Sequence, residues 1–148
     1  MWNPNKSEIL SSICTKAAIV LVIIAAFAMP YLIPKYVTFT GKDLDIIHSL
    51  LLTVYACALP GLVSLICLDR LLVNIRREEV FAIKNVKLLR ALSWCSFVFS
   101  VILFISGFYY ILFVIIAVSA AFLGLILRVI KNIFEKAIII KQENDFTI

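Results

Sequence analysis

Hydrophobic and polar residues alternate along this chain in long blocks. Four runs, at about residues 17–34, 46–68, 91–106 and 108–127, contain no Asp, Glu, Lys or Arg, and short charged stretches separate them. A helix needs about 20 apolar residues to cross a hydrocarbon core roughly 30 Å thick, and the runs approach or reach that length. The pattern predicts an all-α integral membrane protein, in which residues 1–148 form one domain with four spans.

The third and fourth runs are separated by a single residue, Gly107. As a helix, the uncharged stretch 91–127 would be about 55 Å long, nearly twice the roughly 30 Å of a hydrocarbon core. The stretch therefore has to fold back as a hairpin. We place the bend at Ser106 and Gly107, because glycine relaxes the steric limits on a turn and the three aromatic residues that follow suit a membrane interface.

The linker 69–90, which we call the elbow, is more patterned than a simple connector. Apolar residues repeat at helical spacing from Leu68 to Ile75, so the second span should continue beyond the membrane as an amphipathic helix. We expect that helix to break near Glu78. A second helix should begin near Ala82 and lead into the third span.

The tail 128–148 continues the fourth span in the same way. A stripe at helical spacing consists of Ile130, Ile133, Phe134, Ala137 and Ile138, and the opposite face consists of Arg128, Lys131, Asn132 and Glu135. The stripe could pack on the elbow, lie on the membrane surface or bind another protein, and the nearby elbow is the favoured partner. The predicted fold is thus a four-helix bundle in the membrane with cytoplasmic helical extensions of spans 2 and 4.

Charge then orients the spans. Of the 14 Lys and Arg residues, twelve lie in the N-terminal segment, the elbow and the tail, whereas the first outer loop holds only Lys35 and Lys42 and the second holds none. Because Lys and Arg favour the cytoplasmic side, we predict a multi-pass protein of the bacterial cytoplasmic membrane with both termini in the cytoplasm. This bias, together with the attraction of anionic lipid headgroups, accounts for the net charge of +5 without direct nucleic-acid binding.

One alternative concerns the first run. Ala26-Phe27-Ala28 resembles a signal-peptidase site, so this run could be a cleaved signal peptide. However, the apolar residues continue past that site to Pro34, and a sixteen-residue polar lead is long for a secretory signal. We therefore expect a retained first span.

Few side chains in this sequence could carry chemistry. The composition is 64% hydrophobic with a mean hydropathy of +1.09, which excludes a soluble domain. Cys14, Cys57, Cys67 and Cys95 show no paired spacing and His48 is the only histidine, so we expect no metal site, disulfide or cofactor. The sequence has no paired carboxylates, nucleophile-base set or phosphate-binding glycine loop, and no enzymatic activity is predicted.

Polar and small residues in the second span suit helix packing, and they also leave room for a ligand. Pro60 and Gly61 fall near its middle, where a kink is expected that could act as a hinge. His48, Tyr55 and Ser64 could line a small ligand cavity. Small residues four apart in the second and fourth spans let helices approach closely, so a homodimer is an alternative that the sequence leaves open.

The elbow and the end of the chain resemble a known family. The stretches 71–77, 80–81, 85–86, 88–90 and 143–148 are similar to an uncharacterised bacterial family of membrane proteins, domain of unknown function twenty-nine seventy-five. The resemblance covers nearly the whole chain. It implies four spans, cytoplasmic termini, no established enzymatic activity and a neighbouring gene that often encodes a small helix-turn-helix transcription regulator.

Two positions depart from that family. It usually has Gly where this chain has Glu78, and a Thr cap where this chain has Ala82. Both changes weaken the expected turn, since loss of a Thr N-cap costs about 1 kcal/mol. Either the helix boundary shifts or another group supplies the cap, and Asn144 or Asp145 of the tail is a candidate, because a short polar acceptor suits a helix N-terminus.

Our leading hypothesis is that the elbow and tail hold such a regulator at the membrane and release it when the spans rearrange. Six residues would carry the contact: Arg76, Arg77, Phe81, Asn85, Asn144 and Asp145. The same residues could instead only tie the tail to the elbow. Two further alternatives are a small transporter or transporter subunit, with His48 and Pro60-Gly61 as its candidates, and an immunity protein against a membrane-active peptide that acts through the outer loops.

Overall fold

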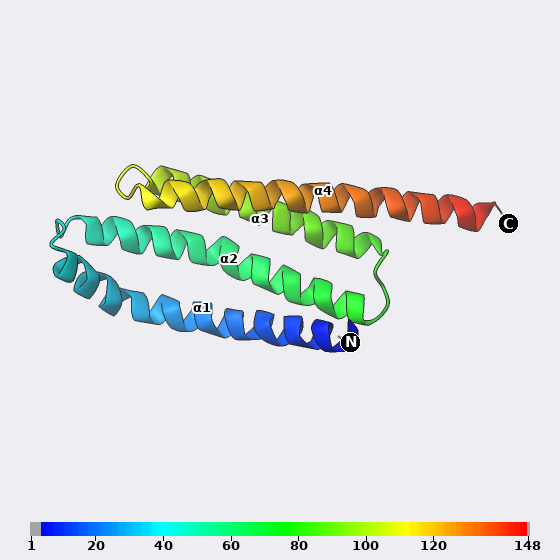
Figure 1. Cartoon of the computed structure of the whole chain (residues 1–148), viewed down its shortest axis with the longest axis horizontal. Helices are drawn as coiled ribbons and strands as arrows, with labels where there is room; N and C mark the ends of the chain where they lie inside the picture. The colour runs from blue at the N-terminus through cyan, green and yellow to red at the C-terminus, as the bar shows by residue number, and fades with distance from the viewer. Residues whose placement is uncertain (1–3, 148) are drawn as a thin grey trace.

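Four long helices make up the computed structural model, which describes residues 4–147. They are α1 (Pro4–Thr40), α2 (Ile46–Arg76), α3 (Ile83–Ser106) and α4 (Leu112–Phe146). Figure 1 shows them side by side and antiparallel, joined by short connections. All four are long and apolar enough to cross a membrane. The predicted all-α class with four spans is confirmed, and the protein is a multi-pass membrane protein.

The bundle is laid out as an open row. Backbone contacts join α1 to α2, α2 to α3 and α3 to α4, and within residues 4–147 none joins α1 to α4. The start of α1, the elbow and the end of α4 lie at one end of the row, which we call the elbow end (Figure 1). The connections 41–45 and 107–111 lie at the other, the loop end.

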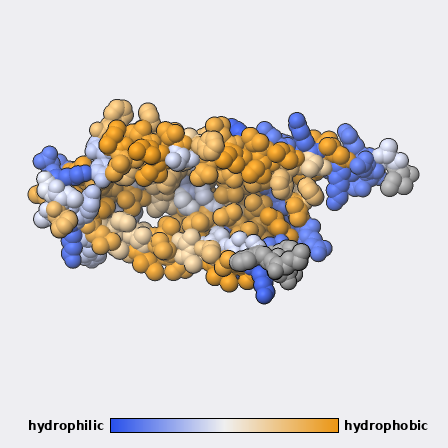
Figure 2. All heavy atoms as spheres, in the orientation of Figure 1, coloured by the Kyte–Doolittle hydropathy of each residue, from blue (hydrophilic) through white to orange (hydrophobic). Residues whose placement is uncertain are grey.

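The middle of the molecule is covered by apolar side chains. Figure 2 shows a hydrophobic belt across the helices, with hydrophilic residues gathered at both ends. Large side chains such as Phe27, Leu52 and Leu59 are more than 70% exposed in this belt. Monomeric soluble proteins rarely expose apolar patches of this extent, whereas a surface that faces lipid must be apolar. The belt is therefore the surface that meets the bilayer.

Packing between α3 and α4 is close. Ala117 is 1% exposed, and an added Cβ at Gly124 would lie 3.2 Å from the Phe97 ring. Ser93 donates a hydrogen bond to the Gly124 carbonyl oxygen at 2.9 Å, and Ser100 donates one to the Ala117 carbonyl oxygen at 2.7 Å. In lipid, small residues and interhelical hydrogen bonds are what hold helices together, because burying apolar surface gains little there.

Packing between α1 and α2 is looser. A cavity of about 260 Å³ lies between them, and Gly61 contributes to its lining. An added Cβ at Gly61 would meet no atom within 4 Å. One hydrogen bond crosses this interface near its middle, from the Tyr55 hydroxyl to the Ala26 carbonyl oxygen at 3.0 Å. α2 itself runs without interruption through Pro60 and Gly61.

The bend between the third and fourth helices lies where it was predicted, but glycine is needed there for a different reason. α3 ends at Ser106, and Gly107 has a φ of −60°, which any residue adopts. A Cβ on Gly107 would overlap Cγ2 of Val114, so the close approach of α4 leaves no room for a side chain there. The helix α4 begins at Leu112, four residues after the expected start of the span, because residues 108–111 form the turn.

We predict that Gly124→Leu destabilises the protein. The added side chain overlaps the Phe97 ring and pushes α3 from α4, and overpacking of this kind costs about 1–3 kcal/mol. Gly61→Leu is the matched control, because its side chain enters the open space beside α1. Thermal unfolding of both purified variants in one detergent measures the difference. Equal losses of stability at the two glycines would contradict the packing described.

Candidate functional site

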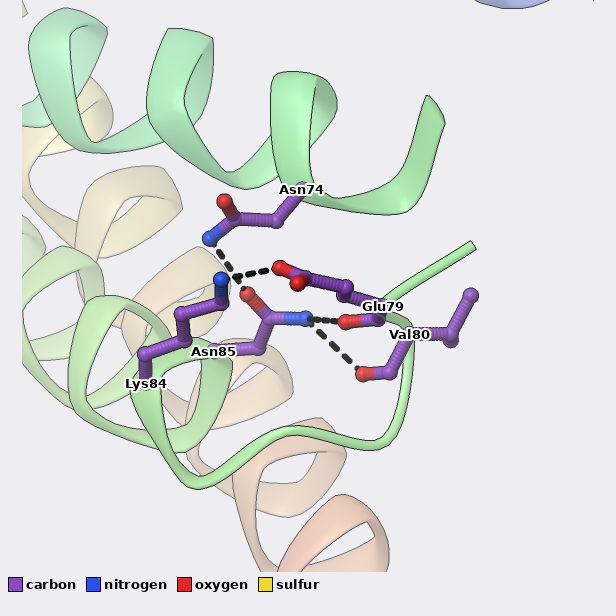
Figure 3. A network of polar contacts seen from close by, with 5 residues as sticks. All are labelled: Asn74, Glu79, Val80, Lys84 and Asn85. Atoms are coloured by element: carbon purple, nitrogen blue, oxygen red, sulfur yellow. Dashed lines mark hydrogen bonds and ion pairs between the residues drawn. The ribbon is translucent and has the colours of Figure 1, made fainter. Parts of the chain in front are cut away.

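The side chain of Asn85 holds the elbow together. Asn85 is fully buried, and its amide nitrogen donates hydrogen bonds to the carbonyl oxygens of Glu79 at 2.7 Å and Val80 at 2.8 Å. Its amide oxygen accepts a hydrogen bond from Asn74 at 2.8 Å. Figure 3 shows how this one side chain joins the end of α2, the turn and the start of α3. Residues 77–82 are thereby held in a defined loop.

The two positions that depart from the family pattern lie in this loop. Glu78 has a φ of +60°, a left-handed conformation that glycine adopts readily and other residues adopt at a cost. Ala82 is the N-cap of α3, and no side chain bonds there. The two candidates for this cap, Asn144 and Asp145, do not supply it, because both are exposed near the far end of α4. The amide of Asn85 orders the turn instead.

An ion pair closes the solvent side of the same loop. Lys84 donates a hydrogen bond to the carboxylate of Glu79, and both side chains are about half exposed. This hydrogen bond and the charge of Lys84 lower the pKa of Glu79 below its ordinary value. The contribution to stability is therefore present at neutral pH and is lost as the pH falls through the lowered pKa. Solvent screening keeps it small at this exposed site.

The helix α4 packs on the elbow. Leu71 of α2 with Leu89 and Leu92 of α3 forms a buried cluster, against which Ile130 and Phe134 of α4 pack. The rings of Phe81 and Phe134 lie 5.9 Å apart between centroids. An ion pair between Arg90 and Glu135, at 3.8 Å, adds a polar contact beside the cluster. The tail stripe could have packed on the elbow, the membrane surface or another protein. Its first residues, Ile130 and Phe134, pack on the elbow.

The predicted facing of that stripe is partly wrong. Ile133 is 58% exposed, whereas the side chain of Lys131, expected on the opposite face, is only 12% exposed. The Lys131 ammonium pairs with Glu135 at 2.7 Å, and Glu135 also faces Arg90. A lysine can lay its long apolar stem along a helix interface while its charge finds a carboxylate, and hydrophobic spacing alone does not reveal this.

The last turns of α4 project past the elbow (Figure 1). The helix has 35 residues and is therefore about 52 Å long, whereas a hydrocarbon core is roughly 30 Å thick. We call residues 139–147 the projecting segment, and all of them are exposed. It presents Ile139 at 49%, Ile140 at 59% and Phe146 at 90% exposure, beside Asn144 and Asp145. Ile148, which ends the family-like stretch, lies outside the described residues.

The six predicted contact residues lie partly at the elbow and partly on the projecting segment, and they differ in exposure. Arg76, Arg77 and Phe81 are exposed at the elbow, and Arg76 donates a long hydrogen bond of 3.4 Å to the Glu8 carbonyl oxygen. Asn85 lies beneath them and has no exposed surface. Asn144 and Asp145 lie apart, on the projecting segment. The elbow and the tail thus form two neighbouring surfaces at one end of the molecule.

The three predicted ligand-lining residues are spread along α2. His48 and Ser64 are sixteen positions apart, which is about 24 Å along a helix. His48 is exposed, Tyr55 bonds to Ala26, and Ser64 donates to the carbonyl oxygen of Pro60 within its own helix at 2.8 Å. The structure does not bring them together around one cavity.

Hydroxyl groups that the sequence analysis did not single out gather instead at the loop end. Tyr109 donates a hydrogen bond to the Ser49 carbonyl oxygen at 3.0 Å, and Thr53 is bonded to both Tyr109 and Ser106. A cavity of about 230 Å³ lies beside these groups, and one of about 500 Å³ opens among residues 41–49. The spacing of Ser49 and Thr53, one helical turn apart, was the available signal.

We predict that Asn85→Ala unfolds the elbow locally. The change leaves the Asn74 amide and two loop carbonyls without their partner, at about 1–3 kcal/mol for each group that stays buried. Hydrogen exchange measured by mass spectrometry should show faster exchange across residues 77–84. Asn132→Ala, which removes an exposed amide from α4, is the control and should leave exchange there unchanged. Unchanged hydrogen exchange across residues 77–84 in Asn85→Ala would show that Asn85 does not order the loop.

We also predict that Glu78→Gly stabilises the protein. A non-glycine residue in the left-handed region costs about 1–2 kcal/mol, which the smaller residue avoids. Part of the gain is offset by the greater freedom of glycine in the unfolded chain, so about 0.5–1 kcal/mol should remain. Thermal unfolding tests this. Glu8→Gly is the control, because Glu8 lies in the regular part of α1, where glycine should lower the stability. A loss at Glu78→Gly would be contrary evidence.

Over residues 9–148 the chain matches the family described as protein of unknown function (DUF2975). No curated protein and no solved structure matches it. Because the family match covers the elbow, all four helices and nearly the whole length of the chain, the protein belongs to the DUF2975 family of proteins of unknown function.

Proposed function

We propose that this protein is a membrane-bound binding protein whose elbow end holds a small helix-turn-helix transcription regulator. The elbow end carries twelve of the 14 Lys and Arg residues, so we assign it to the cytoplasm of a bacterial cell. A regulator of transcription would be encountered on that side. The frequent presence of such a gene beside members of the resembling family supports the choice of partner.

One observation carries the proposal: the projecting segment leaves apolar side chains uncovered beyond the membrane. Ile139 and Phe146 are seven positions apart, so they lie on one face of the helix. A helix that packs on nothing is only marginally stable in water. An amphipathic helix end of this kind suits the groove of a partner, which would cover these anchors.

The elbow surface would supply the second part of the contact. Arg76 and Arg77 are exposed there, and Phe81 is half exposed above Phe134. Asn85 acts indirectly in this scheme, because it is buried and fixes the loop that presents Phe81. Release would follow from movement of the spans, with Pro60 and Gly61 of α2 as the proposed hinge.

A small transporter is the second candidate. The smaller cavity at the loop end favours it, since this cavity lies between α2 and α3 beside the hydroxyl groups of Thr53 and Ser106. His48 is the one histidine near that end and could move a proton. A protective role against a membrane-active peptide would use the same end through Asp43 and Asp45, which border the larger cavity.

We predict that the regulator co-purifies with the full chain and is lost when the projecting segment is altered. Phe146→Asp and Ile139→Asp should each lower its recovery about tenfold or more, because buried apolar anchors dominate such interfaces. The measurement is quantitative mass spectrometry after co-expression with the regulator encoded beside the gene and purification in mild detergent. Deletion of residues 141–148 should have the same effect.

Phe108→Asp is the matched control, because Phe108 is 87% exposed at the loop end. It should leave the regulator bound. Phe81→Ala and Arg76→Ala test the elbow separately, and recovery unchanged in both would remove the elbow from the contact. A preparation of the full chain without a regulator would reject the proposal and turn attention to the loop end.

A further inference from the structure

A pocket at the elbow end lies between α2 and α3. Its volume is about 400 Å³, and it is lined by Asp69, Arg70, Val73, Asn74, Lys84, Lys87 and Leu88. Apolar side chains and the stems of the two lysines form most of its wall. Charged groups from both helices lie around it. None of these residues except Asn74 and Lys84 takes part in the polar network of Asn85.

Three positive charges border this pocket. Lys84 is paired with Glu79, whereas within residues 4–147 neither Arg70 nor Lys87 forms an ion pair. Basic pockets between membrane helices on the cytoplasmic side bind the phosphates of lipid headgroups. The apolar wall beside the charges suits the start of an acyl chain, so the lining combines the two properties of a phospholipid.

Asp69 sets this pocket apart from a simple basic patch. Asp69 lines the pocket, yet its carboxylate forms no ion pair in the described part of the chain. Its Oδ1 atom is buried and is the one buried side-chain nitrogen or oxygen among the described residues without a hydrogen-bond partner. A carboxylate at a membrane boundary is costly unless a cation or hydrogen-bond donor satisfies it. The pocket thus offers sites for a phosphate and for an ammonium group.

The pocket also lies at the depth of lipid headgroups. Residues 46–68 of α2 contain no Asp, Glu, Lys or Arg, so Asp69 and Arg70 are the first such charges beyond the apolar run. On the neighbouring helices, the Arg128 guanidinium lies 5.3 Å from the Trp94 ring centroid. Tryptophan is enriched at membrane interfaces, and arginine reaches the headgroups from there.

We propose that this pocket binds the headgroup of phosphatidylethanolamine in the leaflet on the elbow side. Arg70 and Lys87 hold the phosphate, Asp69 accepts hydrogen bonds from the ammonium group, and an acyl chain follows Val73 and Leu88. Phosphatidylcholine has the same net charge but no N–H donors for the carboxylate. Phosphatidylglycerol has no positive group at all. This binding is independent of any regulator at the projecting segment.

Native mass spectrometry of the delipidated full chain tests the proposal, with the three lipids carrying identical acyl chains. The wild type should retain one phosphatidylethanolamine and should bind it about tenfold more tightly than phosphatidylcholine. A factor of this size is what one charge-assisted hydrogen bond, here from the ammonium group to Asp69, contributes. Asp69→Asn should abolish that preference and leave phosphatidylcholine binding unchanged. Arg70→Gln and Lys87→Gln should weaken both lipids, whereas Lys141→Gln on the projecting segment is the control.

Equal binding of phosphatidylethanolamine and phosphatidylcholine by the wild type would overturn the proposal without any variant. A preference for phosphatidylglycerol that Asp69→Asn leaves intact would also overturn it, because the pocket would then be a general anion site. Displacement of the lipid by soluble phosphoethanolamine at comparable concentration would assign the same headgroup chemistry to a soluble ligand and reject the lipid.

Discussion

The buried amide of Asn85 is the interaction on which the elbow end depends. A loop between two membrane helices exposes backbone carbonyls that have to find donors, and here one side chain satisfies two of them while it binds Asn74 of the preceding helix. With this loop fixed, Leu71 and Leu89 meet and form a surface for Phe134. The position of α4 is therefore set from outside the membrane as well as from within it.

Inside the membrane, the four helices are held unequally. Lipid tails compete with apolar side chains for helix surfaces, so close backbone approach and hydrogen bonds decide which helices adhere. Between α3 and α4 both are present, because Gly124 and Ala117 admit the neighbouring helix and their carbonyls accept bonds from serines. Between α1 and α2 a cavity remains. A rigid pair and a more loosely attached helix thus share one fold.

Much of this fold could be predicted from the sequence, because apolar run length and helical spacing respond to the same bilayer that shapes the structure. The helix count, the bend at Ser106 and the break near Glu78 followed from such patterns. What could not be predicted depends on neighbours that are distant in sequence. The inward position of Lys131 needs the carboxylate of Glu135 in the geometry that α3 imposes, and the burial of Asn85 needs loop carbonyls. The hydroxyl groups at the loop end likewise come from α2, α3 and the turn that follows α3.

The open row has a consequence for how the chain reaches its native state. Because each helix has backbone contact only with its neighbours in sequence, every close approach of two backbones joins segments that are synthesised one after the other. Each new helix can pack on its predecessor soon after it is synthesised, and only single side chains of α4, such as Phe113 and Phe134, later reach residues of α1 and α2. Such local connectivity favours rapid folding. It also leaves α1 and α4 with one neighbouring helix each. Because a cavity lies beside α1 whereas hydrogen bonds tie α4 to α3, α1 is the outer helix that detaches at the lower energetic cost.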